Sequence, residues 1–124
     1  MDIKKIDSVS IPVRDLAKSG KWYQDVLGLP EIWRMDESKM VGYAVGDNSA
    51  SINLEQTGQT GMEIIIQVES VDAARRTLER KGARFAGETF TIPEIGKGAH
   101  FVDPDGNRLM LLDYSIEHAR EQTG

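Results

Sequence analysis

Apolar and polar residues alternate over residues 6–13, near the start of the chain. Val9 and Ile11 fall on one face of this stretch, whereas Ser8 and Ser10 fall on the other. A period of two residues is typical of a β-strand with one buried face. The pattern therefore predicts a strand with an apolar back and a small, polar front.

A helical pattern follows the first strand. Asp15 is a suitable N-cap, the apolar spacing extends to about Leu27, and Gly28 supplies a C-terminal stop. Polar breaks then separate three strand candidates, and Asn53 on the third of them faces the front. The predicted helix stripe comprises Leu16, Tyr23, Val26 and Leu27, and the strands are expected at 31–35, 40–45 and 51–55.

The same order of elements recurs after the flexible segment 57–61. Residues 62–68 alternate again, with Glu63 on the face opposite the main apolar row. Ser70 is the N-cap of a second predicted helix, which runs to about Lys81. Its stripe comprises Val71, Ala74 and Leu78, strands are expected near 84–91, 99–103 and 108–114, and the tail 115–124 either frays or forms one short helix.

A strand-helix-strand-strand-strand order therefore occurs twice, as module 1–56 and module 62–114 of one domain that spans residues 1–124. Such a duplication predicts an α+β fold made of two βαβββ modules. Because each helix stripe matches the apolar backs of the strands in its own module, both helices are expected to pack on the outer face of the sheet.

A tight turn joins the last two strands. Residues 103–107 read Asp-Pro-Asp-Gly-Asn, in which the proline presets one turn position and the glycine accepts a positive φ. Hairpin pairing across this turn is expected to bring His100 close to Met110 on the front face. A histidine changes charge near neutral pH, so proton transfer is chemically available at His100.

Charge and composition exclude several classes of function. The 124 residues carry a net charge of −5 and no cysteine, so disulfides, thiolate metal sites and cysteine nucleophiles are excluded. The acidic balance argues against nucleic acid and anionic membranes as partners. No apolar run approaches the length of a membrane span, and the expected location is cytoplasmic.

Three stretches resemble the vicinal oxygen chelate superfamily, which includes glyoxalase I, extradiol dioxygenases and the fosfomycin- and bleomycin-resistance proteins. They are residues 6–16 (IDSVSIPVRDL), 22–29 (WYQDVLGL) and 101–107 (FVDPDGN). The resemblance implies that the two modules curl into an incomplete barrel around a cavity. It also implies a homodimer.

The resemblance places the metal-ligand positions of the family on Ser8, Asn53, Glu63 and Met110. Of these side chains only the Glu63 carboxylate is a good ligand for a divalent first-row metal. The inherited metal site therefore looks dismantled, and we expect neither a metal nor another cofactor.

Several residues are candidates for contact with a small molecule. The predicted ligand-binding set is Ser8, Ser10, Trp33, Tyr43, Asn53, Glu63, His100 and Met110. Glu63 and His100 are also the candidates for acid–base catalysis. Structural alternatives are open for several of them: Glu63 is a solvated residue or a partner of Arg108, His100 is a solvent-exposed or barrel-rim histidine, the serines are small spacers, and Trp33 or Tyr43 is a core residue.

Two functions follow from these observations. The first is a protein similar to glyoxalases and bleomycin-resistance proteins that binds a small molecule in the barrel cavity without the inherited metal. The second is a lyase, isomerase or dioxygenase-like enzyme with an atypical metal shell, or one that uses Glu63 and His100 as acid and base. A subunit of a larger assembly, with no ligand of its own, is a third alternative.

Overall fold

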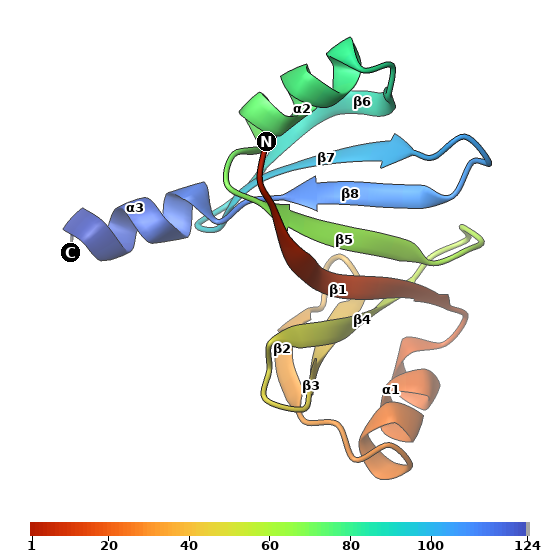
Figure 1. Cartoon of the computed structure of the whole chain (residues 1–124). Coiled ribbons are helices and arrows are strands. Elements are labelled where there is room, and N and C mark those ends of the chain that lie inside the picture. The colour runs from red at the N-terminus through yellow and green to blue at the C-terminus, as the bar shows by residue number, and fades with distance from the viewer. Residues whose placement is uncertain (124) are drawn as a thin grey trace. The chain divides into compact units, whose positions relative to one another are not determined.

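The computed structural model describes residues 1–123 (Figure 1). Its elements are β1 (Ile3–Val13), α1 (Leu16–Asp25), β2 (Glu31–Met35), β3 (Met40–Val45), β4 (Ala50–Gln56), β5 (Glu63–Val68), α2 (Val71–Arg80), β6 (Arg84–Ile92), β7 (Gly96–Val102), β8 (Arg108–Leu112) and α3 (Ser115–Thr123). The predicted α+β class and the repeated βαβββ order are confirmed. The tail forms a short helix, α3, which is one of the two alternatives predicted for it.

Contacts group the chain into two compact units, which we call the first unit (residues 7–64) and the second unit (residues 1–6 and 65 onward). In the first unit the strand order is β2-β3-β4-β1, with β1 parallel to β4 and the other pairs antiparallel. In the second unit the order is β5-β8-β7-β6, and β7 is antiparallel to both of its neighbours, β6 and β8.

Helix α1 covers an apolar core on the back of the first unit's sheet. Val41, Tyr43 and Leu54 are almost fully buried there, and Leu16 and Tyr23 from α1 pack against them. The Asp15 side chain accepts a hydrogen bond from the Lys18 amide, as expected of an N-cap.

The helix ends two residues earlier than predicted. Val26 is its C-cap and is 62% exposed, and Leu27 is 49% exposed, so neither belongs to the apolar stripe. The reason is the turn at Gly28, where φ is +70° and the chain folds back so that the Leu29 amide donates to the Tyr23 carbonyl. Leu29 then fills the core position that the periodicity assigned to the helix.

Helix α2 covers a second core, in which Val68, Val71, Ala74, Ala99 and Leu111 are buried. Leu78 packs against this cluster together with Phe85 and Phe101, so the predicted stripe of the second helix is confirmed. Ser70 caps the helix through a hydrogen bond from the Ala73 amide. Figure 1 shows α2 lying along β6.

Asp113 connects three segments of the second unit. Its carboxylate accepts hydrogen bonds from the amides of Val71 (2.7 Å), Lys97 (2.9 Å) and Ser115 (3.2 Å), and from the Ser115 hydroxyl (2.7 Å). Burial by itself raises the pKa of the Asp113 carboxyl, but these donors outweigh it and hold the pKa below its ordinary value. Asp113 therefore ties the starts of α2 and α3 to β7.

The hairpin turn between β7 and β8 forms as predicted. The Asp103 side chain accepts hydrogen bonds from the amides of Asp105 (2.9 Å) and Asn107 (2.8 Å), and Gly106 has a φ of +87°. Bonds from Asn107 above all lower the pKa of the Asp103 carboxyl. The hydrogen bonds of the Asp103 carboxylate therefore stabilise the turn.

No helix among the described residues has the length and apolar character needed to cross a membrane.

Candidate functional site

Four residues stand in one row across the first unit's sheet. Ser10 on β1 pairs with Asn53 on β4, Asn53 with Gly42 on β3, and Gly42 with Trp33 on β2. Directly paired residues on neighbouring strands project to the same side of a sheet. The side chains of Ser10, Asn53 and Trp33 thus lie on one side of the sheet, with the bare backbone of Gly42 between them, and we call this side the front face of the first unit.

A chain of hydrogen bonds holds the polar part of this face. The Ser51 hydroxyl donates to Asn53 Oδ1 (3.1 Å), Asn53 Nδ2 donates to the Ser8 hydroxyl (3.2 Å), and Ser8 donates to Asp7 Oδ2 (3.0 Å). Ser8 is 1% exposed and Asn53 is 7% exposed. The order of donors fixes the rotamers of these buried groups and gives the face a defined polar patch.

Trp33 lies across Gly42. A Cβ atom added to Gly42 would stand 2.1 Å from Trp33 Nε1, so only glycine leaves room for the indole ring. The ring covers the buried backbone of Gly42 while remaining partly exposed itself. The alternation pattern gave no indication of a role for Gly42, although a glycine inside a strand often signals a close approach of another group.

The second unit also has an aromatic ring packed against a strand glycine. Phe90 on β6 pairs with Gly98 on β7, and a Cβ atom at Gly98 would stand 2.6 Å from the Phe90 ring. The Phe90 ring also stacks on the His100 imidazole, with 5.1 Å between ring centroids. His100 in turn pairs with Met110, as the hairpin pattern predicts.

The surroundings of Met110 are apolar. Met110, Ile65 and Leu112 are buried together, and Phe90, Ile92, Ile95 and Tyr114 pack against them. The face of the second unit that carries His100 therefore offers aliphatic and aromatic contacts around one imidazole.

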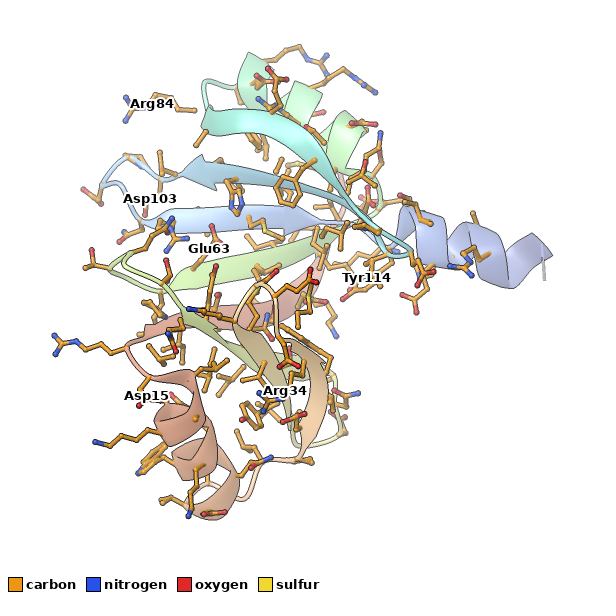
Figure 2. The ribbon with its side chains drawn as sticks, turned by 180° about the vertical axis from the view of Figure 1, so that it is seen from behind. Asp15, Arg34, Glu63, Arg84, Asp103 and Tyr114 are labelled. Carbon is orange, nitrogen blue, oxygen red and sulfur yellow. The ribbon has the colours of Figure 1, made fainter. Side chains whose placement is uncertain are left out.

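Glu63 is the first residue of β5 and belongs to the first unit. The residue is buried, with 5% of its surface exposed, and it is labelled in Figure 2. Burial of a carboxylate requires compensating polar interactions, and Glu63 has them. The position is consistent with either of the two predicted roles, ligand contact or structural partner.

Tyr43 does not share the front face with the other candidates. It alternates with Gly42 along β3, and its ring is buried in the core beneath α1, where it stacks on Tyr23 at 6.2 Å. The structure thus places Tyr43 in the core, which is the alternative that the sequence left open for it. Sequence alone could not separate an aromatic core residue from an aromatic lining residue on the same strand.

The donor groups present do not fit a transition metal at the inherited positions. The Ser8 hydroxyl and the Asn53 amide are engaged with each other, and Met110 offers only a thioether among apolar neighbours. Firm sites need at least three good donors that converge on one point. Within the described part of the chain, no three His, Asp or Glu side chains come together in such a group.

Comparison with known proteins identifies relatives of this chain. Residues 5–111 match the model of the Glyoxalase/Bleomycin resistance protein/Dioxygenase superfamily. A protein of Bacillus subtilis (strain 168) described as uncharacterized protein YraH is 27% identical over 123 residues, which cover 86% of this chain and 96% of the relative.

Solved structures show the same fold. Methylmalonyl-CoA epimerase from Mycobacterium tuberculosis superposes with a TM-score of 0.77 and 21% identity, covering 95% of this chain and 93% of its own. Homoprotocatechuate 2,3-dioxygenase from Brevibacterium fuscum gives a TM-score of 0.74 and 22% identity, covering 91% of this chain and 33% of the dioxygenase. The predicted relationship to the vicinal oxygen chelate proteins is confirmed, and this chain belongs to the Glyoxalase/Bleomycin resistance protein/Dioxygenase superfamily.

Proposed function

We propose that this protein binds a small organic molecule on the front face of the first unit, without the metal ion of its metal-dependent relatives. The observation that carries the proposal is the hydrogen-bonded chain from Ser51 through Asn53 to Ser8. Two positions that would hold a metal are instead parts of a preorganised polar surface. Such a surface binds by hydrogen bonds and shape, which need no ion.

The chemistry of the face favours a planar ligand. The exposed part of the Trp33 indole offers a flat apolar surface for stacking, and its π-system also attracts cations. Ser10 adds a hydroxyl in the same row. A net charge of −5 further favours a cationic over an anionic ligand through long-range attraction.

The first test is whether a bound molecule depends on Trp33. We expect native mass spectrometry of the protein, purified without chelator, to detect an added small-molecule mass that disappears in Trp33→Ala. Trp22→Ala is the matched control, because Trp22 lies on α1, is 49% exposed and is outside the front-face row. Equal retention by both variants would contradict the proposed site.

Elemental analysis of the same preparation tests the absence of a metal. We expect substoichiometric zinc, iron, nickel and manganese after dialysis, and no rise in melting temperature when these ions are added. A stoichiometric metal whose thermal stabilisation is abolished by Glu63→Ala would contradict the proposal. That result would favour the alternative of an enzyme with an atypical metal shell.

The enzyme that uses Glu63 and His100 without a metal remains the other alternative. If this alternative holds, the protein converts the identified ligand to a product. Both Glu63→Gln and His100→Gln then abolish this turnover but still bind the ligand. Binding without turnover would support the binding function.

The homodimer remains a prediction that follows from family resemblance. We expect sedimentation velocity at micromolar concentration to give one species of twice the 13.8 kDa chain mass. The physical reason is that short open sheets expose strand edges, which a second copy covers. A single species at the chain mass would exclude it.

A further inference from the structure

The first unit has a concave surface on the helix side of its sheet. A cavity of about 450 Å³ opens between α1 and the β2–β3 hairpin. This volume is in the range of small-molecule sites. The polar residues that line it are Lys21, Gln24 and Asp25 from α1, Arg34 from β2 and Tyr43 from β3, with Gly20 beside them.

The Tyr43 hydroxyl reaches the wall of this cavity. The residue is 1% exposed, and its Oη lies so close to α1 that a Cβ atom at Gly20 would stand 2.7 Å from it. This contact explains a glycine in the middle of a helix, a position that costs helix stability. Within the part of the chain that the structure describes, no group forms a hydrogen bond with this hydroxyl. A hydroxyl that lacks a protein partner and lines a cavity is a donor available to a ligand.

The charges around the cavity favour an acceptor as the ligand. Burial raises the pKa of the Tyr43 hydroxyl, and the negative charge of Glu31 raises it further. The positive charge of Arg34 offsets part of this increase. The hydroxyl therefore stays protonated and able to donate. The Arg34 guanidinium, which lines the cavity, donates two hydrogen bonds of 2.8 and 3.3 Å to the Glu31 carboxylate.

The cavity lining contains more donors than acceptors. Lys21 and Arg34 contribute charged donors, and Gln24 contributes an amide that can donate, whereas Asp25 is the one carboxylate of the lining. Among the described residues, Lys21 has no ion-pair partner. The charged Lys21 ammonium and the neutral Tyr43 hydroxyl are therefore both available to donate hydrogen bonds to a ligand oxygen.

We propose that this cavity binds a small carboxylate, which accepts a hydrogen bond from the Tyr43 hydroxyl and pairs with Lys21. The site lies on the opposite side of β3 from Gly42 and Trp33, so it is separate from the front-face site. It does not depend on the proposed function above, and either proposal can fail without the other.

Acetate is a suitable probe, with chloride as a control for ionic strength and methylammonium as a cation of similar size. We expect acetate to cause saturable shifts in the backbone amide NMR signals of Gly20, Lys21 and Tyr43. Removing one hydrogen bond to a charged ligand weakens binding about tenfold, which is the expected effect of Tyr43→Phe. Tyr23→Phe is the matched control, because it removes a hydroxyl from the neighbouring stacked ring, which does not line the cavity.

Gly20→Ala provides an independent variant, since its Cβ atom would displace the hydroxyl while adding helix propensity. We expect it to weaken acetate binding as Tyr43→Phe does, with circular dichroism confirming the fold of each variant. Non-saturable shifts, equal acetate affinity in Tyr43→Phe and Tyr23→Phe, or saturation by methylammonium in place of acetate would each overturn the proposal.

Discussion

Replacing Asp113 with alanine is expected to lower the free energy of unfolding by about 3–5 kcal/mol. The 2%-exposed carboxylate accepts four hydrogen bonds, from Val71, Lys97 and twice from Ser115. Alanine would leave the amides of Val71 and Lys97 without this acceptor. A buried donor that loses its partner costs more than the net value of the bond.

The pH dependence of stability supplies a second signature of Asp113. Because the pKa of Asp113 in the folded state lies below its ordinary value, the ionised carboxylate stabilises the fold at pH values above the unfolded-state pKa. This stabilisation is lost as the pH falls below the unfolded-state pKa and through the lower folded-state pKa. We therefore expect wild-type stability to drop in acid and Asp113→Ala to show a weaker drop.

Urea unfolding at several pH values measures both effects. Asp105→Ala is the matched control, because that exposed carboxyl lies in the turn at the other end of β8 and none of the hydrogen bonds around Asp113 involves it. We expect the control to stay within about 0.5 kcal/mol of wild type. A loss below about 1 kcal/mol in Asp113→Ala would show that water replaces the carboxylate.

Replacing Gly42 with alanine is expected to displace the Trp33 ring and abolish binding at the front face. The added Cβ atom would stand 2.1 and 2.2 Å from ring atoms of Trp33, far inside contact distance. The φ of Gly42 is not positive, so alanine is compatible with the backbone and the effect comes from the ring alone. Overpacking of this kind costs about 1–3 kcal/mol.

Tryptophan fluorescence in a Trp22→Phe background reports on Trp33 alone. We expect a red shift of its emission in Gly42→Ala, because the ring loses its cover against the sheet and becomes more exposed. Gly58→Ala is the matched control, since a Cβ atom there meets nothing within 4 Å. Unchanged emission together with retained ligand would show that the ring position is unimportant for binding.

The alternation of residues determined much of the fold without tertiary information. The bounds of β2 and β3 match the prediction at both ends, and Ser8, Ser10 and Asn53 share the predicted face. The turn 103–107 and the opposition of His100 and Met110 also followed from local chemistry. These features are local because strand alternation and turn geometry depend on neighbours in the chain.

Other features were decided by contacts between distant segments. The end of α1 depends on the packing of Leu29 into the core, and the helical periodicity of the sequence gives no information about this contact. Tyr43 and Trp33 are both aromatic strand residues, and only the packing of α1 and the space above Gly42 assigned them to opposite faces. Asp113 looked like the end of a strand, but its role requires the starts of two helices to meet one carboxylate.

For the candidate site as well, some features followed from the sequence and others only from the tertiary structure. The sequence alone predicts that three of the four positions assigned by the family resemblance, Ser8, Asn53 and Met110, lack good metal donors, because ligand chemistry is a property of single residues. Tertiary structure decided that Ser8 and Asn53, which are 45 residues apart, satisfy each other. A hydrogen bond between two strands depends on their register, and register is fixed only when the whole sheet has assembled.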